Sequence, residues 1–275
     1  GDDIFHPTML EELVAAARNG KADIAICDMQ EFDDATKERN HVAWALKRSQ
    51  LPRTSAFNGW QDMPGNIFAA FMDKLYRTEF VLDSGIRFPE DLPNSEDMLF
   101  VYPLLVLAQR IAVVDEVLID HRIGRGNTVS SSRTKAPYAF YDAICRMKSF
   151  LQKQPESWNA LQKDYLNWAF DWTLWNIETI GDRLVAHEMT KRLHNGGFPE
   201  LELALHEASY FAAYPRSMAR YATLMNSLGP NMRDNGPLGS CNKLPYGKYR
   251  CWNDMNYAQK GLSVLRDKLR GPSEW

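Results

Sequence analysis

The segment HPTMLEELVAAARNGKADIAICDMQEFDD, residues 6–34, combines two hydrophobic periods and constrains the fold more than any other part of the chain. Pro7 suits the first position of a helix, and Gly20 is placed to end it. Between them, apolar side chains repeat at the spacing of one helix face, at Leu10, Leu13, Val14 and Ala17. Residues 22–32 then show the apolar pattern of a buried strand. A helix that runs directly into a strand predicts an α/β layer arrangement.

The composition is that of an ordinary globular protein. A chain of 275 residues allows one or two domains with a sizeable core. The formal net charge of −3 gives no reason to expect nucleic acid as a partner. The four cysteines have no C-x-x-C spacing, which favours a reducing compartment over a disulfide framework and argues against a zinc site. No apolar run approaches the roughly 20 residues that cross a bilayer.

The rest of the first 133 residues continues the layered pattern. Residues 64–82 are predicted to contain a short helix and a segment that passes under the sheet. A helix is predicted over residues 95–109, bent by Pro103. The run IAVVDEVLIDHRI, residues 111–123, is a strand candidate rich in Val and Ile, and a polar loop with two glycines follows.

After residue 134 the sequence becomes mainly helical. Helices are predicted over residues 136–154, 157–180, 181–197 and 199–214. The second carries large apolar side chains at spacings of three and four, on one face: Trp158, Leu161, Tyr165, Trp168, Trp172 and Trp175. This face has two interpretations, the core seam of a helical bundle or a surface that stacks on sugars or lies at a membrane interface.

The last part of the chain has a different character again. Residues 229–248 are rich in Gly, Pro and Asn and predict an irregular connector. Between Lys243 and Arg270 there are seven Lys and Arg against two acids. This excess indicates either a solvated helix face or a peripheral attraction to an anionic membrane. We therefore expect three parts: an α/β part over residues 1–133, a helical domain over 134–228, and a connector with a C-terminal basic helix over 229–275.

Two short acidic clusters are candidates for chemistry. Asp2 and Asp3 lie in a loop before a helix, where they are either part of a polar turn or ligands for a hard divalent cation. Glu96 and Asp97 follow Asn94 and Ser95 at a predicted helix start. They either complement the helix dipole or are poised there to accept a proton from an alcohol.

Cations follow or flank both acidic clusters. Lys74 lies in the DKLYR segment, and His121, Arg122 and Arg125 lie in DHRIGRGNTVSSSR. A loop with His, Arg, Gly and hydroxyl groups can close over a phosphate through guanidinium groups and backbone N–H groups. A histidine beside an arginine is otherwise an ordinary surface residue.

The order of these motifs resembles that of the inverting glycosyltransferases of family 2, which have the GT-A fold. GDDIFHPTMLEELV is similar to the second half of that family's D-x-D-D motif, with Asp2 and Asp3 as its last two acids. KLYRTEFVLDSGIRF and NSEDMLF match the family's Lys-Leu-Tyr-Arg segment, the aromatic residue after Ile-Arg, and the Glu-Asp pair. IDHRIGRGNTVSSS matches its Y-x-(Y/H)-R and S-x-S loop, with Ile119 in place of the usual tyrosine. The resemblance covers residues 1–133.

The resemblance implies roles for the acids. Asp2 and Asp3 would help Mg²⁺ or Mn²⁺ to hold the diphosphate of a nucleotide-sugar donor. Asp97 would be the general base that deprotonates the hydroxyl of a glycan or lipid-linked acceptor, and Glu96 would orient that acceptor. The reaction would be a direct displacement that inverts the anomeric carbon.

The resemblance also implies that His121 and Arg122 lie on a loop that approaches the diphosphate. Lys74 and Arg125 are further candidates for substrate binding. The fold would be the C-terminal part of a GT-A, Rossmann-like domain followed by a mainly helical region. The nucleotide-base pocket of such a domain would precede Gly1, so we expect an N-terminal part to be missing and the chain alone to be inactive.

The absence of a Q-x-x-R-W motif favours a single-addition or short-polymer enzyme over a processive polysaccharide synthase. Enzymes of this kind often build bacterial surface or cell-wall glycans on the cytoplasmic face of the membrane, which is the location expected here. Two alternatives remain open. One is a non-catalytic helical interaction protein with a structural α/β remnant. The other is a metal-dependent phosphatase that uses Asp2 and Asp3.

Overall fold

The structure is a computed structural model that describes residues 3–41, 56–62, 73–124, 133–214, 217 and 220. The chain divides into two compact units. The first comprises residues 1–90 and 96–128 and contains a mixed sheet, and the second comprises residues 91–95 and 129–275 and is helical where it is described. A mixed α/β part followed by helices is the architecture that the sequence predicts.

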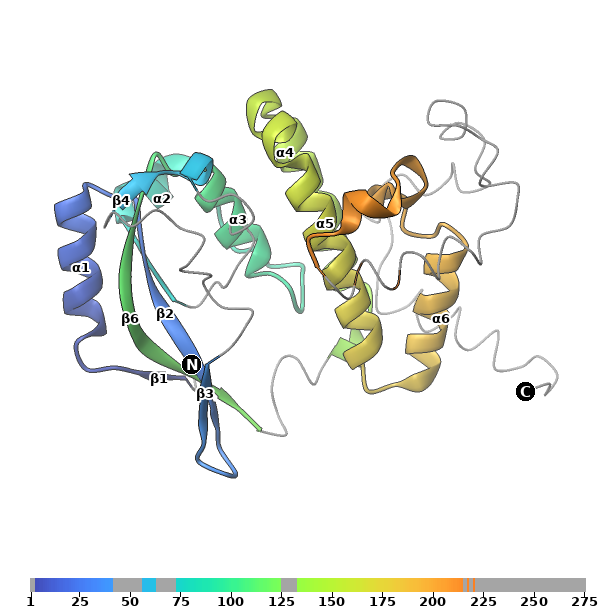
Figure 1. The fold of residues 1–275 in the computed structure, drawn as a ribbon, viewed down its shortest axis with the longest axis horizontal. Coiled ribbons are helices and arrows are strands. Elements are labelled where there is room, and N and C mark those ends of the chain that lie inside the picture. Colours follow the sequence, from blue (N-terminus) through green and yellow to red (C-terminus); the bar gives the residue numbers. More distant parts are fainter. Residues whose placement is uncertain are drawn as a thin grey trace. The chain divides into compact units, whose positions relative to one another are not determined.

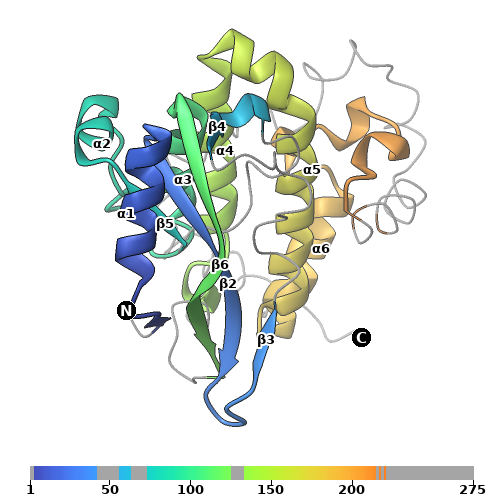
Figure 2. The same cartoon turned by 60° about the vertical axis from the view of Figure 1, so that its left-hand side comes forward.

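Among its described residues, the sheet of the first unit has six strands built around one parallel pair (Figure 1). Its strands are β1 (Ile4–Phe5), β2 (Ile24–Asp33), β3 (Arg39–His41), β4 (Ala56–Asn58), β5 (Lys74–Tyr76) and β6 (Arg110–Ile123). The long strands β2 and β6 are parallel, and every other pairing is antiparallel. β4 pairs with the first half of β6 and β1 with its second half. The hairpin between β2 and β3 projects at one end of the sheet (Figure 2).

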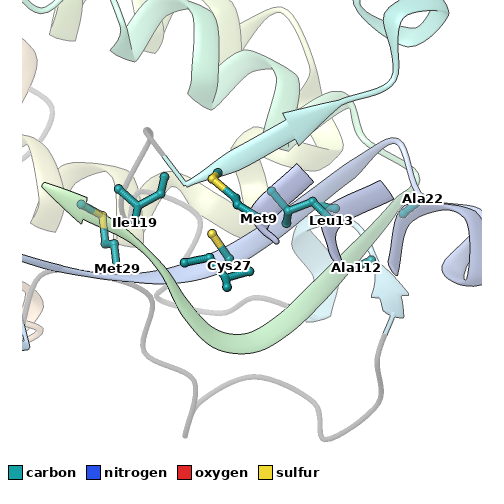
Figure 3. Packing of buried hydrophobic residues seen from close by; sticks show 9 residues of the cluster. Met9, Leu13, Ala22, Cys27, Met29, Ala112 and Ile119 are labelled. Carbon is teal, nitrogen blue, oxygen red and sulfur yellow. The ribbon is translucent and has the colours of Figure 1, made fainter. Parts of the chain in front are cut away.

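Helix α1 (Met9–Gly20) covers one face of the sheet, and α3 (Met98–Leu107) lies on the other (Figure 1). Nine buried side chains fill the space between α1 and the sheet (Figure 3): Met9, Leu13, Ala22, Ala25, Cys27, Met29, Ala112, Leu118 and Ile119. One position in the predicted helix face is wrong. Leu10 is 65% exposed, whereas its neighbour Met9 is 6% exposed. The buried face is therefore centred on Met9 and Leu13, and Leu10 lies a quarter turn away from it.

Gly20 is the last residue of α1 and not the residue that terminates it. Lys21 takes the left-handed conformation at the helix end, with φ 47°. A Cβ atom on Gly20 would lie 2.7 Å from Ala56 Cβ of β4. Glycine is therefore required here because the helix end approaches the sheet closely.

The helix predicted over residues 95–109 begins later than the sequence suggested. Ser95 has a positive φ of 63° and cannot belong to a regular helix. Asp97 is the N-cap residue, α3 runs over Met98–Leu107, and Pro103 lies within it as predicted. Helix α2 (Thr78–Ser84) and the short helix η2 (Trp60–Asp62) complete the described part of this unit.

The second unit contains three of the predicted helices, α4 (Ala139–Gln152), α5 (Pro155–Thr179) and α6 (Arg183–His194). The helix predicted over residues 199–214 is wrong. Three short 3-10 helices occupy that stretch, η4 (Pro199–Leu201), η5 (Leu203–Leu205) and η6 (Ala208–Phe211). Glu202 between the first two has a left-handed φ of 54°, which breaks a continuous helix.

The aromatic face of α5 forms packing within the helical unit. Leu161, Tyr165 and Trp168 are buried, and Tyr165 donates a hydrogen bond of 2.6 Å to the Ile144 carbonyl of α4. These contacts agree with the core-seam interpretation. The connector and basic helix predicted over residues 229–275 lie outside the described residues. No helix in the described part of the chain is long and apolar enough to span a membrane.

Candidate functional site

The first part of the candidate site is held together by strand pairing. β1 is antiparallel to β6 with Ile4 opposite Asp120, so Asp3 falls beside the next residue, His121. His121 Nδ1 lies 2.9 Å from Asp3 Oδ1. The same oxygen accepts the backbone N–H of Arg122 at 3.0 Å. The sheet therefore brings together an acid and two residues that the sequence singled out separately.

The two hydrogen bonds lower the pKa of the Asp3 carboxyl group. Burial by itself would raise the pKa of this carboxyl group, but the bonds from His121 and the Arg122 amide outweigh it, and the pKa lies below its ordinary value. Asp3 is therefore an anion at neutral pH. The contact through Nδ1 fixes the orientation of the His121 ring.

The Arg122 side chain is engaged elsewhere. Its Nη1 atom lies 3.3 Å from Asp34 Oδ1, and its guanidinium lies 5.7 Å from the centre of the Phe32 ring. Both partners are at the end of β2, next to the hairpin. The Arg122 backbone N–H therefore donates to Asp3, while the Arg122 side chain links β6 to the end of β2.

A second polar network supports this region, and the motifs did not identify it. Asp120, one residue before His121, accepts hydrogen bonds from Gln30 Nε2 at 2.7 Å and from Arg39 Nε at 2.8 Å. On the same hairpin, His41 Nε2 lies 3.1 Å from Asp28 Oδ2. The only available sequence signal was the run of polar residues at the ends of two predicted strands, and the partners come from three different strands.

Asp97 forms the second part of the candidate site, at the start of α3. Its carboxylate accepts the Met98 backbone N–H at 2.9 Å. Burial raises its pKa to about 6, and the neighbouring charge of Glu96 adds to the shift. A carboxylate with a pKa of about 6 is ionised at pH 7 and still basic enough to take a proton as an alcohol attacks. The structure places Asp97 and Asp3 on different elements, and their convergence on one cleft stays a prediction.

Lys74 has a different environment from the one predicted. Its Nζ atom lies 2.6 Å from Asp73 Oδ1, and the two side chains are 2% and 0% exposed. The ion pair lies where β5 meets β2, because the Cys27 backbone N–H donates to the Asp73 carbonyl at 3.0 Å. In this structure the Lys74 side chain does not reach solvent, and a contact with substrate stays a prediction.

The predicted metal ligands are only partly described. Asp2 and Arg125 lie outside the described residues. Within the described ranges, no group of three or more His, Cys, Asp or Glu side chains is arranged to hold a metal ion. Asp3 offers one carboxylate oxygen that no hydrogen bond described here uses, beside the His121 ring. An oxygen and an imidazole suit Mn²⁺, and Mg²⁺ prefers oxygen alone, so the pair fits such a site as a part of it.

Comparison with known proteins agrees with the fold and the motifs. The chain is distantly homologous to the family 2 glycosyltransferases with the GT-A fold, and the predicted resemblance is thereby confirmed. The relatives are the poly(ribitol-phosphate) beta-N-acetylglucosaminyltransferases TarS of two Staphylococcus aureus strains, Mu50 and MW2, each 32% identical over 143 residues. That alignment spans 52% of this chain but only 23% of each relative. No protein-family model matches the chain.

Solved structures of TarS show the same fold. The crystal structure of S. aureus TarS 1–349 superposes with a TM-score of 0.54 at 19% identity, covering 82% of this chain and 64% of that one. The same part of TarS in complex with UDP gives a TM-score of 0.52 at 17% identity, with the same coverage. The chain thus spans less than two thirds of the relatives that it matches.

Proposed function

We propose that this chain is part of a glycosyltransferase that moves a sugar from a nucleotide-diphosphate donor to a hydroxyl acceptor with inversion of the anomeric carbon. The observation that carries the proposal is Asp97. By the resemblance in sequence, Asp97 corresponds to the aspartate of the family's Glu-Asp pair. Burial raises its pKa to about 6, which suits a general base. The homology to TarS supports the reaction class.

Asp97 takes the proton in the proposed reaction. The acceptor hydroxyl attacks the anomeric carbon while its proton passes to the Asp97 carboxylate. A glycosidic bond forms as the bond from that carbon to the diphosphate oxygen breaks, and the nucleoside diphosphate leaves with the bonding electrons. General-base assistance of this kind contributes on the order of 100-fold to 10,000-fold in rate. Glu96, beside Asp97 in the sequence, would orient the acceptor.

Asp3, His121 and Arg122 would serve the leaving group. A divalent cation held by Asp3 together with Asp2 would neutralise charge on the diphosphate. His121 is fixed by Asp3, so its ring would approach the diphosphate in one orientation. The Arg122 amide holds the same carboxylate, and this pre-organisation avoids rearrangement during the reaction.

The names of the relatives suggest a donor and an acceptor. TarS is named as a poly(ribitol-phosphate) beta-N-acetylglucosaminyltransferase, and one of its structures contains UDP. We therefore propose UDP-N-acetylglucosamine as the donor and a polyol-phosphate polymer of a bacterial cell wall as the acceptor. We place the reaction in surface-glycan synthesis at the inner face of the membrane.

The proposal is tested with the full-length gene product that carries this chain. Transfer of N-acetylglucosamine from UDP-N-acetylglucosamine to poly(ribitol phosphate) is measured with wild type and with Asp97→Asn. We expect transfer by the wild type and a loss of at least about 100-fold in the variant. Binding of UDP in the presence of Mn²⁺ should be unchanged, because Asp97 is assigned to the acceptor.

Two outcomes would contradict the proposal. Absence of both transfer and donor hydrolysis in the wild type, with a range of UDP-sugars, would favour the non-catalytic interaction protein. Loss of UDP binding together with transfer in Asp97→Asn would show that this acid is structural.

A further inference from the structure

Phe88 presents an exposed aromatic ring on an otherwise packed stack. It lies in the loop after α2 and is 53% exposed. Its ring stacks on that of Phe100 in α3, with centres 4.2 Å apart and planes 11° from parallel. Phe100 in turn meets Tyr76 of β5 edge-on, with ring centres 5.5 Å apart. One face of the Phe88 ring therefore packs on Phe100, which in turn packs on a residue of the sheet.

This stack lies beside Asp97. The Phe100 backbone N–H donates to the Asp97 carbonyl at 3.1 Å, which places Phe100 one helical turn after the acid. Residues three apart on a helix lie on the same side. The first turn of α3 thus carries the proposed base and the ring that supports Phe88.

Leu82 and Leu10, two other exposed apolar side chains of this unit, lack these features. Leu82, on α2, is 58% exposed and belongs to no aromatic stack. Leu10, on α1, is 65% exposed on the opposite face of the sheet from α3 (Figure 1). An exposed ring costs free energy in water, and single exposed apolar residues are common. Phe88 differs because its ring stacks on Phe100, one helical turn after Asp97.

We propose that Phe88 is an acceptor-binding residue, and that the free face of its ring packs against the C–H groups of the sugar or polyol unit whose hydroxyl approaches Asp97. The inference rests on the proposed function and adds to it a residue that determines acceptor affinity. A supported ring suits this role because it offers a flat apolar surface without losing side-chain freedom on binding. The hydroxyl groups of the same unit remain free for Glu96 and Asp97.

The test compares Phe88→Ala, Phe88→Tyr and the matched control Leu82→Ala in the full-length gene product. KM for poly(ribitol phosphate) and KM for UDP-N-acetylglucosamine are measured separately, together with hydrolysis of the donor without acceptor. For Phe88→Ala we expect the acceptor KM to rise about tenfold, as an aromatic contact of this size predicts. The donor KM and donor hydrolysis should stay at wild-type values, and Phe88→Tyr and Leu82→Ala should behave like wild type.

Three results would overturn the inference. The first is an acceptor KM within twofold of wild type in Phe88→Ala. The second is an equal rise in Leu82→Ala. The third is a parallel loss of donor hydrolysis in Phe88→Ala, which indicates a structural role. A separate binding experiment tests the inference independently of the proposed function. Calorimetric titration with poly(ribitol phosphate) and no donor should show weaker binding by Phe88→Ala than by wild type, even if no transfer is detected.

Discussion

His121 Nδ1 lies 2.9 Å from Asp3 Oδ1, although 118 positions of sequence separate the two residues. The antiparallel pairing of β1 with β6 produces this contact. It joins the residue before β1 to the second half of β6, and it engages the Nδ1 atom of the histidine ring. Both the lowered pKa of Asp3 and the orientation of His121 depend on it.

Replacing His121 by Ala should raise the pKa of Asp3, because the imidazole bond lowers it and burial remains. The shift is read from the carboxyl ¹³C resonance of Asp3 during a pH titration. The unfolding free energy should fall by about 1.5–3 kcal/mol, the contribution of a hydrogen bond to a charged group. A double-mutant cycle with Asp3→Asn should give a favourable coupling energy between the two side chains. Purely additive effects of the two substitutions on the unfolding free energy would contradict the prediction.

Transfer by the full-length gene product should lose activity in acid as Asp97 is protonated. The pKa of this group is about 6, so kcat/KM should rise with pH through about 6. Well below that value it should fall tenfold for each pH unit, since only the ionised carboxylate accepts the proton. An acid limb centred near the ordinary pKa of an aspartate would show that the site does not desolvate Asp97. The profile is measured under saturating donor.

Asp97→Asn should stabilise the 275-residue chain at high pH and have little effect at low pH. Burial raises the pKa of Asp97 from 3.8 to about 6, so the folded state binds the proton more tightly and loses stability as pH rises through this window. Asparagine removes that penalty, which corresponds to up to about 3 kcal/mol. Urea unfolding at pH 8 and at pH 3, on either side of this window, measures the difference. Equal effects at both values would be inconsistent with a raised pKa.

Lys74→Met should destabilise the chain strongly. The substitution leaves the Asp73 carboxylate, which is fully buried, without the ammonium group 2.6 Å away. Breaking a buried ion pair on one side costs about 3–5 kcal/mol. The double variant Asp73→Asn, Lys74→Met should recover part of this loss, because no buried charge then remains. If Lys74→Met unfolds at the wild-type urea concentration, the pair is not buried as described.

Gly20→Ala should lower the free energy of unfolding, although alanine is the better helix former. The added methyl would lie 2.7 Å from Ala56 Cβ, and overpacking of this kind costs about 1–3 kcal/mol. Gly181→Ala is the matched control, because a Cβ atom at that position meets nothing within 4 Å. Thermal and urea unfolding of both variants should separate them. Stabilisation by Gly20→Ala would show that α1 can move away from β4 without cost.

Much of the architecture could be read from local pattern. The helix–strand order of residues 6–34, the strand over 111–123 and three of the four helices after residue 134 follow from hydrophobic periods, which depend on backbone geometry alone. The motif order also identified the family to which the chain is distantly homologous. The helix predicted over residues 199–214 failed because Glu202 takes a left-handed conformation, which composition does not reveal.

The sequence by itself determined which types of element form and which acids and cations are available for chemistry. Only the tertiary structure decided their states: that Asp3 is bonded to His121, that Lys74 is buried against Asp73, and that Asp97 is desolvated. The physical reason is the separation in sequence of the residues that decide each property. Periodicity is fixed by neighbours three or four residues away, whereas burial and ion pairing depend on segments that meet only when the sheet has formed.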